Sequence, residues 1–242
     1  MTPIQLAAGT VLTTAVAGSG AAAYAALWPQ SQIFGRVLVA GSNPNEIALT
    51  YDDGPNDEAT ERLLEVLARR GVHATFFLIG SFVRQRSGLV RSIASAGHLV
   101  GNHTMTHPWL SWQSSRRIRE ELAGCNAALE DALGTPVRYF RPPHGARRPA
   151  VLRIARELSL TAVQWNITAF DWNPLSAEEI LSNVTKGIER NQRRRRGSNV
   201  LMHDGGHLGI GQPRLPTIEA TSRLLEQYEA SRMKFVTVAE WD

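Results

Sequence analysis

The stretch "LTYDDGP", residues 49–55, places two carboxylates side by side at Asp52 and Asp53. An apolar run, "EIALTY", leads into the pair, and Gly54 and Pro55 follow directly after it. The run is typical of a buried strand, on which adjacent side chains point to opposite faces. Neighbouring carboxylates also repel each other, and a cation between them would relieve that repulsion. The stretch therefore predicts a strand that ends at a functional site.

The sequence around this strand has a regular pattern. From residue 45 onward, β-rich runs alternate with amphipathic helical stretches. One helical stretch opens with a capping box from Ser176 to Glu179, and another ends at Gly134. Strands that alternate with helices predict a parallel α/β fold, and the length fits one closed barrel better than two domains. The expected strands are residues 46–51, 74–80, 98–102, 137–140, 160–166, 199–203 and 234–238.

The composition indicates a globular protein, because 43% of the 242 residues are hydrophobic and 20% are charged. Cys125 is the single cysteine, which excludes an intramolecular disulfide framework, and we expect it to pack on a helix. The net charge of +4 comes from the run Arg193–Arg196, without which basic and acidic residues number 22 each. The run has no interleaved aromatic residues, so a nucleic-acid partner is not expected. We expect a solvated loop far from the chemistry, or else a contact with an anionic membrane or cell-wall surface.

The first 35 residues carry no charged side chain, and "AYA" at 23–25 resembles a signal-cleavage pattern. We predict an export signal or membrane anchor at 1–35, a linker at 36–44 and a catalytic domain at 45–242. A disordered or packed N-terminal segment is the alternative, because the usual basic residues before an export signal are missing. The prediction implies an extracytoplasmic protein, either periplasmic, in the cell envelope or secreted. It also implies that residues 1–35 contribute nothing to the stability of the domain.

The polar motifs share one position, since each follows a predicted strand. In α/β barrels the loops after the strands gather on one face and form the site. His103 and His107, in "HTMTH", are four residues apart and can face a common point. Two histidines and one aspartate of the "DDG" pair would make a three-ligand metal site with open positions, while the second aspartate acts as a base.

Three further motifs supply acid, base and oxyanion chemistry. In "RPPHG" the first backbone N–H after Arg141 belongs to His144, which suits an oxyanion, and Arg141 could hold a catalytic carboxylate through a bidentate contact. His203 and Asp171 each end a strand, and a carboxylate bonded to the imidazole would raise its pKa, as a general acid needs. We expect Asp204 to bond its loop and His73 and His98 to be structural or solvated. His207 could line the cleft, although a loop position is the favoured interpretation.

The motifs "TYDDGP", "HTMTH", "RPPHG", "FDW" and "LMHD", in this order, resemble the five motifs of the polysaccharide deacetylases, carbohydrate esterase family 4. The resemblance spans roughly residues 45–241. It implies a distorted (β/α) barrel of about seven parallel strands and a divalent metal, usually zinc, with cobalt, nickel or manganese as alternatives. It also implies removal of acetyl groups from N-acetylated glycans such as chitin oligomers and peptidoglycan, or from acetylated xylan. The resemblance implies that Asp52 is the base, positioned by Arg141, and that His203 is the acid, tuned by Asp171. It implies that the metal ligands are Asp53, His103 and His107. It also implies that the His144 amide contacts the oxyanion and that Trp165 and Leu201 form the apolar wall around the acetyl methyl.

Two positions depart from the family pattern. The family usually has tyrosine at the position of His144, whose backbone donor survives the change, and a first aspartate where this chain has Thr168. Two other functions fit parts of the pattern: a mononuclear non-haem iron enzyme, which also uses two histidines and one carboxylate, and an inactive carbohydrate-binding homologue. The paired base and acid argue against both. We expect a monomer that acts on an N-acetylated glycan and that associates with a membrane, if at all, through residues 1–35.

Overall fold

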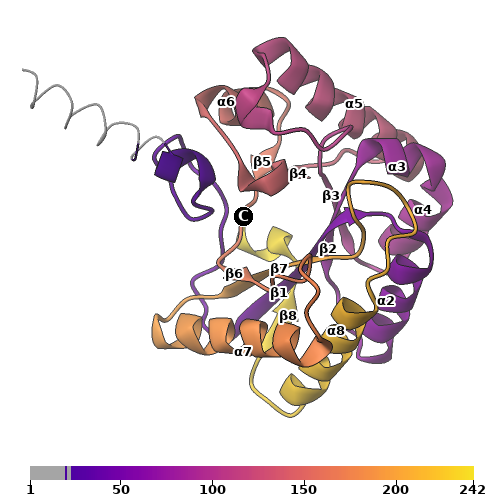
Figure 1. Cartoon of the computed structure of the whole chain (residues 1–242), viewed down its shortest axis with the longest axis vertical. Coiled ribbons are helices and arrows are strands. Elements are labelled where there is room, and N and C mark those ends of the chain that lie inside the picture. The colour runs from indigo at the N-terminus through magenta and orange to yellow at the C-terminus, as the bar shows by residue number, and fades with distance from the viewer. Residues whose placement is uncertain (1–19, 21–22) are drawn as a thin grey trace, which may run out of the picture.

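A parallel sheet forms the centre of the computed structural model, which describes residue 20 and residues 23–242 (Figure 1). Seven strands run side by side in the order β5-β4-β3-β2-β1-β7-β6, and β8 pairs with the first residues of β1. The expected parallel α/β class is confirmed. The strands are β1 (Glu46–Gly54), β2 (Thr75–Leu78), β3 (Leu99–Asn102), β4 (Tyr139–Phe140), β5 (Thr161–Ala162), β6 (Ile167–Thr168), β7 (Ser198–His203) and β8 (Lys234–Val236).

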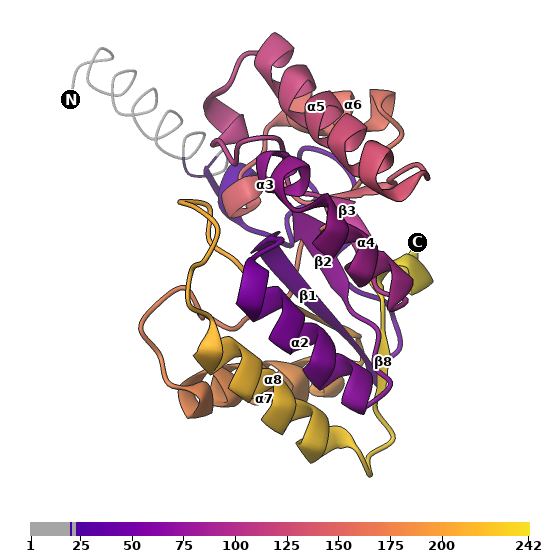
Figure 2. The ribbon, with the colours of Figure 1, turned by 90° about the vertical axis from the view of Figure 1, so that its right-hand side faces the viewer.

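The helices lie outside the curled sheet, with α7 and α8 below it and α5 and α6 above it in Figure 1. Figure 2 shows α2 and α8 side by side, next to β1. The capping box at Ser176 and the left-handed Gly134 that ends α5 form as the sequence predicted. The helices are α2 (Asp57–Arg69), α3 (Gly80–Gln85), α4 (Ser87–Ser95), α5 (Ser115–Leu133), α6 (Pro149–Glu157), α7 (Ala177–Arg193) and α8 (Leu215–Tyr228), with short 3₁₀ turns at Leu110–Trp112, Pro143–Gly145 and Val238–Trp241.

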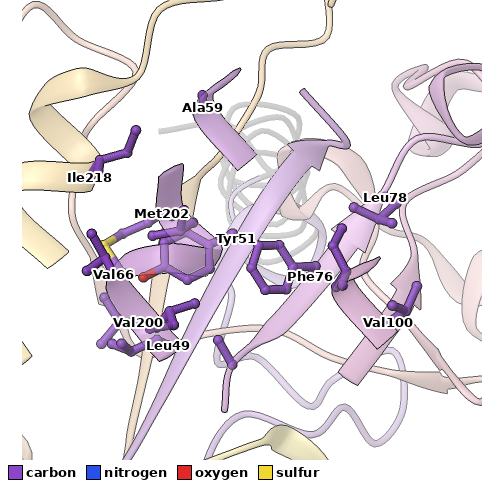
Figure 3. Close-up of a cluster of buried hydrophobic side chains, with 14 of the residues drawn as sticks. Leu49, Tyr51, Ala59, Val66, Phe76, Leu78, Val100, Val200, Met202 and Ile218 are labelled. Atoms are coloured by element: carbon purple, nitrogen blue, oxygen red, sulfur yellow. The ribbon is translucent and has the colours of Figure 1, made fainter. Parts of the chain in front are cut away.

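Strand β1 is the longest strand and has neighbours on both sides, so its residues from Ile47 onward are buried. Burial on both faces explains its continuous apolar run, which is typical of parallel sheets covered by helices. Tyr51 stacks on Phe76 of β2 with ring centroids 5.2 Å apart. Figure 3 shows Tyr51 between Phe76 on one side and Met202 of β7 on the other. This packing fixes the strand whose carboxyl end carries Asp52 and Asp53.

The expected fifth strand, residues 160–166, is wrong in its second half. The chain leaves the sheet after β5 at one edge and rejoins it as β6 at the opposite edge, so the sheet is a half-barrel rather than a closed one. The side chain of Asn166 explains the break, because its Oδ1 accepts the Asn199 amide at 2.9 Å and its Nδ2 donates to the Gly197 carbonyl at 2.9 Å. Together with the backbone bond from the Asn166 amide to the Asn199 carbonyl, these bonds tie residue 166 to β7 instead of letting it continue β5 along β4.

The segment before β1 packs into the open side of the half-barrel. Leu38 forms a parallel bridge with Val163, and Gly197 donates its amide to the Gly41 carbonyl. The guanidinium of Arg147, which is 1% exposed, donates to the carbonyls of Trp28 and Ser31, both at 2.8 Å. Trp28 and Ser31 thus pack on the domain, which argues against the expectation that residues 1–35 contribute nothing to its stability. Most of the expected export segment lies outside the described residues, and within the described part no helix is both long and apolar enough to cross a membrane.

We expect a chain that begins at Ser42 to be less stable than one that begins at Ala23. The shorter chain lacks the carbonyls of Trp28 and Ser31, so Arg147 keeps only the Gly145 carbonyl among the partners in the described part of the chain. A hydrogen bond to a charged group contributes about 1.5–3 kcal/mol. Chemical denaturation of the two chains measures the difference in the free energy of unfolding. Arg147→Met should destabilise the longer chain more than the shorter one, because only the longer chain offers both carbonyls. Equal stability of the two unmutated chains would contradict the role of this contact.

Candidate active site

The backbone at Asp53 explains how two adjacent carboxylates reach one point. Asp53 adopts a left-handed conformation with φ 72°, and the register of β1 against β2 shifts between Asp52 and Gly54. The irregularity breaks the strict alternation of the strand, so both carboxylates lie in the same cleft. Glycine is required at position 54 for close packing, since a Cβ there would lie 2.3 Å from the Asp204 carboxylate.

Asp53, His103 and His107 meet at the ends of β1 and β3, as the sequence predicted. The Oδ1 atom of Asp53 lies 3.4 Å from His103 Nε2 and 3.1 Å from His107 Nε2. Two ligands at about 2.1 Å from a tetrahedral ion stand about 3.4 Å apart, so these separations fit a shared divalent ion. His103 Nδ1 bonds to the Arg141 carbonyl at 2.9 Å, which fixes the tautomer whose Nε2 lone pair faces Asp53.

The protonation states suit metal binding as well. Burial opposes ionisation of Asp53, but the hydrogen bonds and charges of His103 and His107 outweigh it and hold the pKa of Asp53 well below its usual range. Burial lowers the pKa of His107. A carboxylate and neutral imidazoles are the forms that coordinate a metal ion. Asp53 Oδ1 and His107 Nδ1 are also buried without a hydrogen-bond partner among the described residues, and a cation would satisfy the carboxylate.

His207 joins this cluster from the loop after β7. The possible ligand atoms of Asp53, His107 and His207 all lie within 4.8 Å of one another. The His207 ring stacks on that of His107, with centroids 4.7 Å apart and an interplanar angle of 13°. Two ligand triplets thus share Asp53 and His107, and they differ in whether His103 or His207 completes them.

The loop that carries the two histidines is held from below by polar side chains. Asn102 Oδ1 accepts the amide of Thr104 at 2.7 Å, and the buried Glu121 of α5 accepts the amide and hydroxyl of Thr106 at 2.8 and 2.6 Å. Sequence reasoning missed Glu121. The sequence could have indicated it, because Glu121 lies between Ile118 and Leu122 on the apolar face of a helix. A carboxylate there needs a hydrogen-bond partner, since burying it unpaired would be costly.

Asp52 is held on the other side of the cleft by Arg141. The guanidinium donates through Nη1 to Asp52 Oδ1 at 2.7 Å and to Thr50 Oγ1 at 2.8 Å. The expected bidentate contact is wrong, because Nη2 instead faces the Gln164 carbonyl at 3.4 Å. The second oxygen of Asp52 therefore remains free toward the cleft, where it lies 3.7 Å from His103 Nε2.

His203 pairs with Asp171 as predicted. The imidazole Nδ1 and the backbone amide of His203 both lie 2.8 Å from the Asp171 carboxylate, which also accepts the Thr217 hydroxyl at 2.9 Å. Burial disfavours the imidazolium, but the Asp171 charge outweighs it and raises the pKa of His203 to about 9. His203 is also the cross-strand partner of Asp52 in the β1–β7 ladder. The Asp52 carboxyl group and the His203 imidazole thus stand on neighbouring strands at the same level.

A cleft of about 580 Å³ contains Asp52, Asp53, the histidines of both triplets and His203. Trp165 and Leu201 form buried apolar parts of its wall, as expected. His144 also lines it, with its ring stacked on Trp109 at 4.0 Å. Burial and the neighbouring histidines lower the pKa of His144 to about 4, so this ring is neutral near pH 7.

Comparison with known proteins decides the family. A family model described as polysaccharide deacetylase matches residues 40–163. A peptidoglycan-N-acetylglucosamine deacetylase of Bacillus cereus is 33% identical over 198 residues, covering 81% of this chain and 68% of that protein. This chain belongs to the polysaccharide deacetylase family. A chitooligosaccharide deacetylase of Rhizobium leguminosarum bv. trifolii is 40% identical over 167 residues, covering 69% of this chain and 74% of that protein.

Solved structures agree with this deacetylase fold. A family 4 acetyl xylan esterase from Clostridium thermocellum in complex with a cobalt ion superposes with a TM-score of 0.71 at 30% identity, covering 81% of this chain and 89% of that one. A family pseudoenzyme from Bacillus anthracis superposes with a TM-score of 0.72 at 29% identity, covering 81% and 65%. The cobalt complex supports a divalent metal here. Because a pseudoenzyme shares the fold, the activity of a family member depends on its cleft side chains, and the cleft of this chain contains the carboxylates and histidines that the sequence motifs predicted.

Three side chains that sequence reasoning did not assign complete the deacetylase cleft. Thr168, at the position where the family usually has aspartate, accepts the indole N–H of Trp165 at 2.9 Å and so orients that wall. Asn56 bonds the carbonyls of Asp204 and Gln212, which ties the loop of His207 to the end of β1. Arg214 bonds the Gly205 and Asp171 carbonyls. The Asp204 carboxylate accepts the hydroxyl of Thr60 on α2, so the expectation that it bonds its own loop is wrong.

We expect substitutions of the three histidines to separate the two ligand triplets. His107→Ala removes a member of both triplets and should abolish tight metal binding. His103→Ala should do nearly the same, because His103 Nε2 is oriented toward Asp53. His207→Ala should weaken binding by about 10–100-fold, as is typical of residues that support a metal site. Competition with a chromophoric chelator measures the affinities, and the absorption spectrum of bound Co²⁺ reports the coordination. The exposed His73 gives a control in His73→Ala. A His103→Ala/His107→Ala protein that binds metal like the wild type would refute the ligand assignment.

Proposed function

We propose that this deacetylase hydrolyses the N-acetyl groups of N-acetylglucosamine residues in a glycan polymer or oligomer, using a zinc ion held by Asp53, His103 and His107. The observation that carries the proposal is the pairing of Asp52 with His203 across neighbouring strands, beside the predicted ligands. One is held as a base by Arg141, and the other is held as an acid by Asp171. Hydrolysis of an amide needs both, whereas the oxygen chemistry of a mononuclear iron enzyme needs neither.

The acetyl group can be placed from the walls of the cleft. Trp165 and Leu201 offer an apolar surface for the methyl group, and the backbone amide of His144 is the proposed donor to the oxyanion. Trp109, Phe170 and Trp172 stand at 46%, 46% and 48% exposure around the site, which suits contact with the apolar faces of sugar rings. The same cleft could admit an O-acetyl group. Relatives named as peptidoglycan and chitooligosaccharide deacetylases support an N-acetylated glycan.

The proton transfers follow from the two held pairs. A bound divalent ion supplies Lewis-acid polarisation of the acetyl carbonyl and makes water more acidic. The free Oδ2 of Asp52 takes the proton of the attacking water, while the hydrogen bond from Arg141 to Oδ1 orients the carboxylate. His203 uses Nδ1 to bond Asp171, so its Nε2–H is the proton that passes to the sugar nitrogen as the C–N bond breaks. Acetate and a free amine leave the site.

We also propose that the protein works outside the cytoplasm. The uncharged residues 1–35 and the cell-wall substrates named for several relatives support this placement. Fractionation of cells that produce the intact chain tests it, and recovery in the cytoplasm alone would reject it.

Asp52→Asn should retain the metal yet lose most of the activity. Asparagine is nearly isosteric with aspartate but cannot take a proton from water, and general base catalysis contributes about 10²–10⁴-fold. Acetate release from a chitooligosaccharide, together with the metal content of the same sample, measures both effects. A metal-loaded Asp52→Asn protein with near wild-type rates would overturn the base assignment.

Asp171→Asn should shift the alkaline limb of the pH profile to lower pH. The acid form of His203 is needed, and its pKa of about 9 depends on the Asp171 charge. Removing that charge lowers the folded-state pKa, so activity is lost at a lower pH as the pH rises. The acid limb, assigned to Asp52 and bound water, should stay in place. The readout is kcat/KM against pH for both proteins.

Thr217→Ala is the matched control for this experiment. It removes one hydrogen bond to Asp171 but leaves the carboxylate and its charge in place. Its alkaline limb should therefore stay close to that of the wild type. An alkaline limb that does not move in Asp171→Asn would show that Asp171 does not set the protonation of His203.

A further inference from the structure

A second hollow, of about 740 Å³, lies on the open side of the half-barrel. One wall comes from the segment Trp28–Gln30 and another from the C-terminal half of α7 and the residues after it. We call this hollow the basic groove, because five of its lining residues are cationic: Lys186, Arg190, Arg193, Arg194 and Arg196. Trp28, Trp165 and Phe170 add aromatic surface to it.

The positive charge of the basic groove is not neutralised locally. No carboxylate residue is among its described lining residues. Of its five cationic residues, only Arg193 has an acidic partner in the described part of the chain, Glu189 at 3.8 Å. Arg196 is fixed by bonds to Asn191 and Gln30 at 3.0 and 2.9 Å. Burial and then the charges of Arg194 and Arg190 lower the pKa of Arg196. A bound anion would relieve this repulsion between like charges.

The basic groove adjoins the catalytic cleft. Trp165 lines both hollows. The next residue, Asn166, donates to the carbonyl of Gly197, which directly follows Arg196. The arginine run lies between α7 and β7, and its hollow shares Trp165 with the catalytic cleft, although we expected this loop to lie far from the chemistry. Phe170 of the groove and Trp172 of the cleft are about half exposed, with ring centroids 5.5 Å apart, so a chain molecule that crosses this pair can reach both the acetyl site and the cations.

We propose that the basic groove binds the carboxylates of an acidic glycan strand whose N-acetyl group occupies the catalytic cleft. The inference rests on the proposed deacetylase function and narrows its substrate class. Glycan strands of peptidoglycan carry the carboxylates of attached peptides, or of the lactyl group where no peptide is attached, whereas chitooligosaccharides carry no acidic group. Arginine binds carboxylates through paired hydrogen bonds, and the aromatic residues give apolar contact to sugar rings. The groove thus favours peptidoglycan over a neutral oligomer.

An anionic membrane surface is the competing partner for this charge. The shape of the basic groove argues against it, because Trp165 and Asn166 are only 8% and 9% exposed at its base. A ligand must enter a hollow to touch them, and a flat bilayer surface does not. The groove therefore fits a strand-like molecule better than a membrane.

The test compares Arg190→Gln/Arg194→Gln with a control of equal charge change, Arg84→Gln/Arg91→Gln, on exposed positions of α3 and α4. Acetate release gives kcat/KM on soluble peptidoglycan fragments and on chitopentaose, at low and high salt. The groove variant should lose about three- to tenfold on the peptidoglycan fragments, as expected for two charge contacts near the surface. It should lose nothing on chitopentaose, and high salt should abolish the difference. The control should match the wild type on both substrates.

Equal losses on both substrates, or no loss on the peptidoglycan fragments, would overturn the proposal. If the metal-loaded wild type releases acetate from neither glycan, the deacetylase function itself is rejected. The role of the groove is then tested by binding alone: co-sedimentation with isolated peptidoglycan and with phosphatidylglycerol vesicles compares the same variants. Weaker binding to peptidoglycan alone supports the groove, whereas weaker binding to vesicles alone makes it a membrane contact and rejects the proposal.

Discussion

The left-handed backbone at Asp53 is the constraint on which the site depends. A regular strand would point Asp52 and Asp53 to opposite faces, and one carboxylate would be buried away from the cations that stabilise it. A non-glycine residue at φ 72° costs about 1–3 kcal/mol, so the surroundings must hold it there. Gly205 is part of that support, because a Cβ at this position would lie 2.2 Å from the Asp53 carbonyl oxygen. The glycines of "DDGP" and "HDGG" are therefore explained by close packing at one strand end.

Once both carboxylates share the cleft, their partners give them different tasks. Asp53 faces two imidazoles and is suited to a metal, while Asp52 faces a guanidinium and keeps one oxygen free. Asp171 stabilises the imidazolium of His203. Burial, with a smaller contribution from the charges of Asp53 and Asp52, raises the pKa of Asp204 to about 7, although the hydrogen bond from Thr60 opposes this increase. Four acids of similar intrinsic pKa thus acquire different roles through their contacts, as proton-transfer sites require.

The sequence predicted the features that depend on local pattern, such as the helices and most strands. It also predicted the features that depend on one general rule, that the loops following parallel strands gather at the same face. That rule was enough to bring together residues as distant as Asp52 and His203. It could not predict the break before β6, because "LTAVQWN" is typical of a strand and only the tertiary bonds of Asn166 end it. The packing of Trp28–Ser31 against Arg147 could not be predicted either, because it also depends on tertiary contacts. The composition of this segment is typical of an export segment, and its partner Arg147 is more than a hundred residues away.

The open side of the sheet connects these unpredicted features. A closed barrel would leave no room for the basic groove, whereas at the gap between β5 and β6 Trp165 lines both the catalytic cleft and the groove. The segment before β1 fills part of that gap, and its residues serve two purposes there. Trp28 and Ser31 satisfy the buried charge of Arg147, and Gln30 fixes Arg196 in the basic groove. Stability and substrate reach are therefore coupled through one segment: whatever displaces Trp28–Ser31 both exposes an unpaired guanidinium and removes a wall of the groove.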